Sequence, residues 1–527
     1  MRRFRTATAT TLLVVPIVAG GFLMQERPVN ATARLFDQVV SLVSSQYVDS
    51  VNTAALYEKA AKGMVRELND PYSELMSPKA SESFSRGTGG RYGGTGMYIE
   101  EQQGSIVVYR VFPNTPAEEA GVLEGDRILS IDDKAVSGWG LSKVSETLRG
   151  TVGSQVSVTY QRNGVPEPIK LRFTRRTVHV PAVDYSTMLD DKVGYIPLQT
   201  FNENAAEEVE AAVKKLERDG AKGLVLDMRD NGGGIVDQAL EVSSLFLRDG
   251  LEIASIRGRN GKVEVARSQG NHVATSIPLV VLLDENSASA TEIVAGALQD
   301  HDRALVVGTT SFGKGLVQSV FPLDGGYSLK MTTGKWFTPS GRSIHKERKF
   351  EDGHFVEEKP DSTPETDLER KSRPAYKSDA GRTIYGGGGI APDVLMGDDT
   401  LATLESEFLR SVAAKGQVIQ TVLARYALEL KGTVTPDFKA TPDWTAELMK
   451  RVDAAGVTIV PKFAQTAPAL LTQELEHRVA RQAFGDGVAK RRELSRDRQL
   501  SKAVDLLHHS GTQVELFATA HASVVSK

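Results

Sequence analysis

The chain has 527 residues, of which 25% are charged and 40% hydrophobic, so it is long enough to build several buried cores. The formal net charge of −4 gives no sign of nucleic-acid binding, and the absence of cysteine excludes disulfides. The nine histidines are scattered and never take the His-Glu-x-x-His spacing, so we predict neither a metal site nor a cofactor.

The N-terminus is predicted to be an export signal. Three arginines among the first five residues precede an apolar run, 11–24, and the small residues 31–33 form a cleavage pattern. The apolar run is short for a membrane-spanning helix and contains Pro16, so a cleaved peptide over residues 1–33 is favoured over a retained membrane anchor. We therefore expect a periplasmic or cell-envelope protein.

Residues 34–87 are predicted to be helical, because apolar side chains recur there every three to four residues, as in Leu35, Val39 and Leu42. The next segment is rich in glycine and strand-like runs. Its motifs lie at 92–99, 106–112, 116–122 and 125–131.

This glycine-rich segment resembles a PDZ domain over residues 88–177. In that fold the loop of Gly94, Thr95, Gly96 and Met97 would offer backbone N–H groups to the terminal carboxylate of a bound chain, while the following strand pairs with the peptide. Apolar pockets near Met97 and Ile99 would favour an apolar last residue.

Three apolar, strand-like runs then each lead into a chemically unusual segment. The run 223–226 precedes three glycines, 232–234, which permit close backbone approach to a ligand and expose N–H groups. No Gly-Lys-Ser/Thr follows, so a phosphate-binding loop is not predicted. The other two runs, 278–283 and 304–307, precede Ser289 and Lys314 respectively.

Ser289 and Lys314 together predict a hydrolase. A serine on a sharp strand-to-helix turn faces unpaired helix N–H groups that can stabilise an oxyanion. A lysine in apolar surroundings loses its charge and can act as a base. Each also has an ordinary interpretation, an N-cap serine and a solvated loop lysine. Spacing rules alone leave Ser287, Ser289 and Thr291 open as nucleophiles.

From about residue 36 to 394 the chain resembles the C-terminal processing peptidases, also called tail-specific proteases. The motifs that carry the resemblance are Tyr47-Val48-Asp49, Asp70-Pro71-Tyr72-Ser73, Gly194-Tyr195-Ile196, Asp227-Met228-Arg229-Asp230-Asn231, Ser287-Ala288-Ser289-Ala290-Thr291-Glu292, Phe312-Gly313-Lys314-Gly315-Leu316-Val317-Gln318, Thr338-Pro339-Ser340-Gly341-Arg342 and Gly389-Ile390-Ala391-Pro392-Asp393. The resemblance implies an α/β protease core of the ClpP/crotonase type at 178–397, with an inserted, mainly-β PDZ domain and helical N- and C-terminal regions.

The same resemblance implies a role for each site residue. The family's nucleophile lies three residues before a glutamate and 25 before a lysine, which gives Ser289 as nucleophile and Lys314 as base. Gln318 corresponds to a glutamine that positions the lysine. The oxyanion hole maps to the backbone N–H groups of Ala290 and of a glycine in the triplet, here taken as Gly233.

We therefore expect an exported serine endopeptidase that recognises and cleaves proteins with exposed C-terminal tails. The alternative is a non-catalytic PDZ scaffold on an inactive peptidase fold, which the presence of both Ser289 and Lys314 disfavours. A likeness to acyl-CoA hydratases is a fold-level analogy only.

Two further segments carry less information. Residues 345–382 are strongly polar and lack apolar periodicity, which predicts a disordered loop or long hairpin on the core surface. Residues 398–527 lie outside the resemblance, and 404–430 and 470–507 have helical composition. They form either a helical cap on the core or a module for homo-oligomerisation or adaptor docking.

Overall fold

The structure is a computed structural model that describes residues 31–525, except for 103, 163, 191, 271–272, 274–275, 348, 352–353, 357–366, 398–402 and 495. Most of the predicted export signal, residues 1–30, therefore lies outside the described residues. The chain divides into two compact units, Met1–Leu75 and Met76–Lys527. None of the helices within the described residues combines the length and apolarity needed to cross a bilayer.

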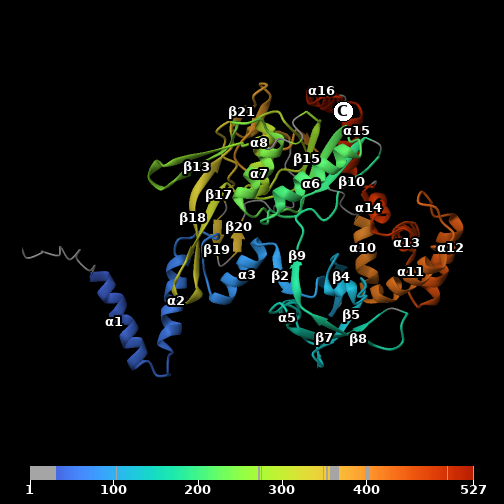
Figure 1. Cartoon of the computed structure of the whole chain (residues 1–527), viewed down its shortest axis with the longest axis horizontal. Helices are drawn as coiled ribbons and strands as arrows, with labels where there is room; N and C mark the ends of the chain where they lie inside the picture. Colours follow the sequence, from blue (N-terminus) through green and yellow to red (C-terminus); the bar gives the residue numbers. More distant parts are fainter. Residues whose placement is uncertain are drawn as a thin grey trace, which may run out of the picture. The chain divides into compact units, whose positions relative to one another are not determined.

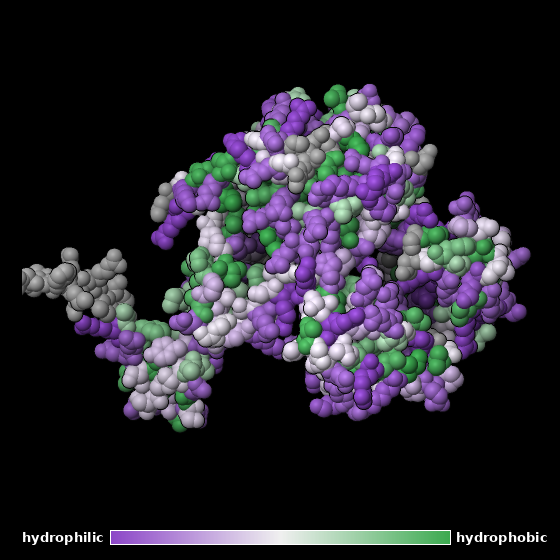
Figure 2. All heavy atoms as spheres, in the orientation of Figure 1, coloured by the Kyte–Doolittle hydropathy of each residue, from purple (hydrophilic) through white to green (hydrophobic). Residues whose placement is uncertain are grey.

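The first unit contains two helices, α1 (Ala31–Gln46) and α2 (Thr53–Arg66). The side chain of Asn52 caps α2 by accepting the Ala55 N–H at 3.2 Å. Figure 2 shows hydrophilic side chains over most of the visible face of the chain, with smaller hydrophobic areas between them. On α1 the apolar residues Leu35, Val39 and Leu42 lie exposed at helical spacing.

The second unit is built on a six-stranded sheet in the order β10-β11-β12-β15-β16-β23. Its strands are β10 (Thr187–Met188), β11 (Val193–Pro197), β12 (Gly223–Asp227), β15 (Leu279–Leu283), β16 (Leu305–Gly308) and β23 (Val394–Leu395). All pair in parallel except β10, which is antiparallel to β11. Apart from Asp227 at the end of β12, the central strands β12 and β15 are apolar, and all their residues are buried, as expected for a parallel sheet that is covered on both faces.

Helices cover both faces of this sheet (Figure 1). On one face lie α6 (Ala205–Arg218), α7 (Val236–Phe246) and α8 (Ala290–Asp300), whose apolar side chains pack with those of alternate strand residues. On the other face lie α15 (Arg498–His508) and α16 (Gln513–Val525). The C-terminal residues thus complete the core around the central sheet. Every residue of α8 is buried, so the helix that begins after Ser289 is held on all sides.

A second sheet contains β14 (Val263–Arg267), β13 (Glu252–Gly258), β18 (Ser328–Phe337) and β17 (Leu316–Pro322) in that order. Within 345–382 the described residues form a hairpin of β19 (Lys349–Glu351) and β20 (His354–Val356), helix α9 (Asp367–Ser372), and β21 (Ala375–Lys377), which pairs with β22 (Thr383–Tyr385). The polar segment therefore contains several short elements, with 357–366 outside the described residues.

The glycine-rich segment forms a small sheet with two helices. Its strands are β3 (Met97–Gln102), β4 (Ser105–Val111), β5 (Arg127–Ile131), β6 (Lys134–Ala135), β7 (Gln155–Gln161) and β8 (Ile169–Thr174), and its helices are α4 (Pro116–Glu119) and α5 (Leu141–Leu148). β3 is an edge strand of this sheet. Before and after it come β1 (Glu74–Met76), α3 (Pro78–Thr88), and the antiparallel pair of β2 (Arg91–Gly94) and β9 (Arg176–His179).

Along the chain, a separate helical bundle follows the strands of the central sheet and precedes α15 and α16. It consists of α10 (Thr403–Val412), α11 (Gly416–Leu430), α12 (Pro442–Ala454), α13 (Thr466–Phe484) and α14 (Asp486–Leu494), which share one apolar core. The predicted helical stretch 470–507 is thus three helices. Gly485, at φ +82°, ends α13, because only glycine adopts this conformation without strain.

Candidate active site

Two neighbouring parallel strands bring the polar motifs to one edge of the central sheet. β12 ends at Asp227 and β15 ends at Leu283, with Asp227 paired to Leu282. The carboxyl ends of parallel strands meet at the same edge, which is the usual location of ligand sites in such sheets. The loop 227–234 therefore lies against the turn that leads into α8.

Ser289 is the last residue of that turn and directly precedes α8. Its backbone has φ 60° and ψ −113°, an uncommon conformation for a residue with a side chain. Such strain persists only where the surroundings enforce it, and it clusters at functional sites. A positive φ on a serine at a strand-to-helix turn is the geometry expected of an exposed nucleophile.

The structure distinguishes the three hydroxyl residues that spacing left open. Ser287 is fully buried, and its Oγ lies 2.8 Å from Asp284 Oδ1 and 2.9 Å from the Met228 carbonyl oxygen. Thr291 is also fully buried and donates to the Asn231 carbonyl at 2.8 Å. Ser289 alone of the three is partly exposed, so its hydroxyl can reach a substrate.

Glu292, in the first turn of α8, joins the Ser289 turn to the Lys314 segment. Its Oε2 accepts the backbone N–H of Ser289 at 2.8 Å and that of Lys314 at 2.9 Å. Its Oε1 accepts the Ser311 hydroxyl at 2.6 Å and the Gly313 N–H at 2.7 Å. One carboxylate oxygen therefore ties both predicted catalytic residues together through their backbones. Sequence reasoning used Glu292 only as a spacing marker and missed this role.

Burial raises the pKa of Glu292, although the four hydrogen bonds oppose that shift. We expect Glu292→Gln to lower the free energy of unfolding by about 1–3 kcal/mol, because the amide NH₂ would face donors and leave them unsatisfied. Cleavage of a peptide should fall as well, since Ser289 and Lys314 would lose their common anchor. Urea unfolding and peptide turnover measure the two effects.

The matched control is Glu241→Gln on α7, an exposed carboxylate that contacts Gln238. It should leave both properties unchanged. A Glu292→Gln protein as stable and as active as wild type would show that the four bonds do not organise the site.

The glycine triplet lies directly beside the Ser289 turn. A Cβ added to Gly233, at φ +95°, would come within 2.6 Å of the Ala288 carbonyl oxygen and 2.9 Å of the Ala290 nitrogen. Only glycine therefore permits this approach. Asn231 orders the loop, because its Oδ1 accepts the Gly233 N–H at 2.9 Å and its carbonyl accepts the Ala288 N–H at 3.0 Å.

Lys314 lies just before β17 and is partly exposed. Its carbonyl accepts the Trp336 Nε1–H at 3.0 Å, so the buried indole of β18 fixes the segment.

Gln318 lies on β17, opposite Thr332, and its Nε2 donates to Thr332 Oγ1 at 3.3 Å. The structure thus brings Ser289, Ala290, Gly233 and Lys314 into one region, whereas the Gln318 amide donates to a side chain of the neighbouring strand.

Asp284 is a further buried acid that sequence reasoning did not single out. It accepts the Asp230 N–H at 2.9 and 3.0 Å and the Ser287 N–H at 2.9 Å. Burial raises the pKa of Asp284 to about 6, against the effect of these bonds. A polar residue directly after five buried apolar residues was the signal in the sequence. Within the described residues, no group of three or more His, Asp or Glu side chains is placed to hold a metal ion.

The predicted tail-binding loop lies between β2 and β3. Gly94 ends β2, Gly96 has φ +90°, and Met97 begins the edge strand β3. The carbonyl of Thr95 accepts the Ala117 N–H at 2.8 Å, and that of Gly96 accepts the Phe112 N–H at 2.9 Å. The loop is thereby fixed against α4, with β3 open along one side of its sheet and in contact with α5.

Comparison with known proteins identifies the family of the chain and its PDZ domain. The family model described as peptidase family S41 matches residues 192–352, that of a PDZ domain matches 107–162, and that of the activating protease CtpB N-terminal domain matches 24–80. The carboxy-terminal processing protease CtpA of Bacillus subtilis (strain 168) is 34% identical over 344 residues, 65% of this chain and 73% of that protein. The chain belongs to peptidase family S41.

This S41 protease is also 39% identical over 315 residues to the carboxy-terminal-processing protease of Bartonella bacilliformis (strain ATCC 35685 / KC583 / Herrer 020/F12,63), which is 59% of this chain and 71% of that protein. Among solved structures, the photosystem II D1 C-terminal processing protease aligns with 69% of this chain and 92% of its own, at 28% identity and a TM-score of 0.37. The family, the PDZ domain and the serine-type protease activity predicted from the sequence are confirmed.

Proposed function

We propose that this S41 protease is an exported endopeptidase that uses Ser289 as nucleophile and Lys314 as general base and cleaves proteins with exposed C-terminal tails. The observation that carries the proposal is the shared carboxylate oxygen of Glu292, which accepts the backbone N–H groups of both residues. Proximity of a nucleophile and a base is the first requirement of such a mechanism. Export rests on the basic and apolar pattern of the first 33 residues.

In the proposed mechanism the Ser289 oxygen attacks the scissile carbonyl as neutral Lys314 takes its proton. Lys314 then returns the proton to the leaving amine, and water cleaves the acyl-enzyme. The oxyanion is assigned to the N–H of Ala290 and to Gly233, whose N–H would exchange its bond with Asn231 Oδ1 for one with the oxyanion. Gln318 is assigned to positioning Lys314 from β17.

Tail recognition is assigned to the loop of residues 94–97. A peptide added along the edge strand β3 would pair with its backbone, while the loop N–H groups hold the terminal carboxylate. The side chains of Met97 and Ile99 on β3 are buried and apolar, so we expect pockets beside them to favour an apolar last residue of the peptide. The bundle of α10–α14 is where we place docking of an adaptor or of a second copy of the chain.

Amidating the C-terminus of a substrate peptide should slow its cleavage at low substrate concentration. Amidation removes the charge that the loop would bind, at a cost of about 1.5–3 kcal/mol, or roughly tenfold or more in affinity. Initial rates far below saturation measure the ratio of free-acid to amidated peptide. Equal rates for the two peptides would show that the protease does not read tails through this loop.

A pair of glycine variants locates the effect. In Gly96→Ala a Cβ would come within 2.2 Å of Thr115 Cβ, so the loop must move and the difference between acid and amide should vanish. Gly104→Ala, at φ +75° with open space around it, introduces a similar backbone strain outside the loop and should keep the difference.

A further inference from the structure

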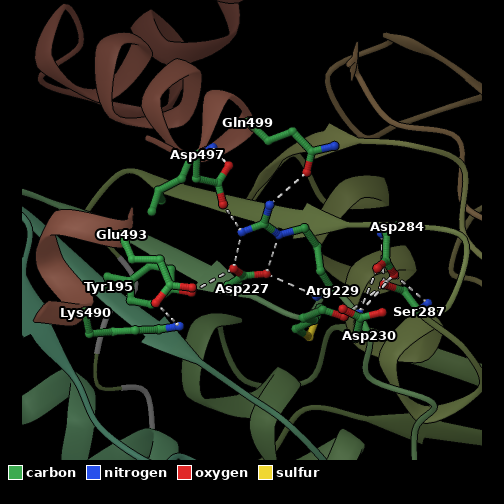
Figure 3. Close-up of polar contacts among 12 residues, drawn as sticks. Tyr195, Asp227, Arg229, Asp230, Asp284, Ser287, Lys490, Glu493, Asp497 and Gln499 are labelled. Atoms are coloured by element: carbon green, nitrogen blue, oxygen red, sulfur yellow. Dashed lines mark hydrogen bonds and ion pairs between the residues drawn. The ribbon is translucent and has the colours of Figure 1, made fainter. Parts of the chain in front are cut away.

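The turn before α15 reaches the loop that adjoins Ser289. Asp497 caps α15 by accepting the Leu500 N–H at 2.8 Å, and Gln499 lies in the first turn of the helix. α15 packs against the sheet face opposite α6–α8, over β12 and β15. Both side chains point toward Arg229, the third residue of the loop 227–234 (Figure 3).

Arg229 is held from two sides. Within its own loop, its Nη2 donates to Asp227 Oδ2 at 2.6 Å and its Nε to Asp227 Oδ1 at 2.9 Å. From the C-terminal segment, Asp497 Oδ2 accepts from Nη2 at 2.6 Å and Gln499 Oε1 accepts from Nη1 at 3.0 Å. The planar guanidinium is thus fixed in one orientation, since its donors have a rigid fork geometry.

Burial and a second hydrogen bond restrict how Gln499 and Asp497 can contact Arg229. Gln499 is 1% exposed, and its Nε2 donates to the Met396 carbonyl at 2.8 Å, which fixes the direction of its oxygen. Arg229 is 19% and Asp497 20% exposed, so solvent screens the pair only in part. Tyr195 also donates to Asp227 Oδ2, at 2.8 Å.

The loop that Arg229 anchors is the one that contacts the nucleophile turn. The Met228 carbonyl lies 2.9 Å from Ser287 Oγ, and the Asn231 carbonyl accepts the N–H of Ala288 and the hydroxyl of Thr291. Two residues further on, Gly233 lies against Ala290. A shift of the loop at Arg229 would therefore move the groups on both sides of Ser289.

We infer that Asp497 and Gln499 are positioning residues of the proteolytic site, which they hold in place through Arg229. They lie beyond the segment 192–352 that matches the S41 family model, and they come from the segment 398–527, where the sequence indicated only a helical cap or docking module. The inference rests on the proposed function for its kinetic consequence. It assigns the C-terminal segment a role in turnover besides covering the core.

The test uses the full chain with Asp497→Ser. Serine can still cap α15, but it has no carboxylate to bind Arg229. The matched control is Asp505→Ser on the same helix, an exposed aspartate that pairs with Lys502 instead. Asp497→Asn is the second variant, which keeps both the cap and the side-chain shape and removes only the charge.

We expect kcat of Asp497→Ser to fall by about ten- to hundredfold, because a small misplacement of catalytic groups costs that much. KM should stay within about twofold of wild type, since a positioning role acts on turnover and not on binding. The urea midpoint should fall slightly, because a partly screened ion pair is lost, but the protein should stay folded under the assay conditions. Asp497→Asn should give a smaller loss, and Asp505→Ser none. In an Arg229→Gln background, adding Asp497→Ser should lower kcat by less than about twofold, because Asp497 acts only through Arg229.

Amide hydrogen exchange of residues 228–234 gives a readout that needs no turnover, and it should quicken in Asp497→Ser only. Unchanged kcat and exchange in Asp497→Ser, or equal losses in Asp505→Ser, would overturn the inference. The proposed function fails separately, if the wild-type chain cleaves no tail-bearing peptide or if Ser289→Ala cleaves it as well as wild type. In that case the exchange experiment still decides whether Asp497 holds the loop.

Discussion

Ser289→Ala should lose peptide cleavage by at least about 10⁴-fold, because it removes the atom that forms the acyl-enzyme. Folding and tail binding should stay near those of wild type, since the partly exposed side chain is small and the alanine keeps the same backbone bond to Glu292. Turnover of a free-acid peptide, with urea unfolding in parallel, measures both properties.

Ser287→Ala is the natural control because it removes a hydroxyl two residues away in the same turn. That hydroxyl is fully buried and contacts Asp284 and the Met228 carbonyl, so its loss should cost about 1–3 kcal/mol of stability. Cleavage should nevertheless remain detectable. Retained turnover in Ser289→Ala together with an inactive Ser287→Ala protein would move the nucleophile and refute the assignment.

The core strands could be predicted from the sequence because each is a short, continuous apolar run. The runs 223–226, 278–283 and 304–307 correspond to β12, β15 and β16, which are buried on both faces of the sheet. The polar segments after these runs then had to meet at one sheet edge. The apolar pattern therefore predicted the strands, while the resemblance to the C-terminal processing peptidases supplied the pairing of the glycine triplet with Ser289.

The choice among Ser287, Ser289 and Thr291 could not be made from local physics. It depends on burial of Ser287 and Thr291 by the loop 227–234, which is more than fifty residues earlier in the chain. The family spacing selected Ser289, a choice that the neighbouring residues alone did not favour. Glu292 was missed for the same reason, since its four hydrogen-bond donors come from separate positions in the fold.

In the C-terminal segment, too, the sequence predicted the local structure but not the contacts with distant residues. Its helical composition was evident in the sequence, but the break at Gly485 was overlooked although a glycine after a long apolar-periodic stretch is a common helix end. The contact of Asp497 with Arg229 joins residues 268 positions apart. No periodicity or motif spacing reports such a contact, so the link from α15 to the active site required the structure.

Lys314→Arg should be inactive, although it keeps a long basic side chain and the backbone bond to Glu292. A guanidinium stays protonated at every accessible pH and has no lone pair to accept the Ser289 proton. The matched control is Lys335→Arg, an exposed lysine on β18 that pairs with Leu316 near the site, and it should keep full activity. An active Lys314→Arg enzyme would exclude the lysine as base.

The pH profile of the wild-type enzyme tests the same assignment without a mutation. Because only the neutral amine accepts a proton, kcat/KM should rise with pH, by about tenfold per unit below the pKa of the base, and then level off. The profile is best measured above pH 7, where Asp284, whose pKa burial raises to about 6, is ionised and keeps its bonds to Asp230 and Ser287. Below that pH, protonation of Asp284 would weaken the loop and add a second, structural fall in activity. A kcat/KM that falls steadily as the pH rises from about 7 to above 10 would mean that Lys314 acts in its protonated form, and it would then serve only to position the substrate or the oxyanion.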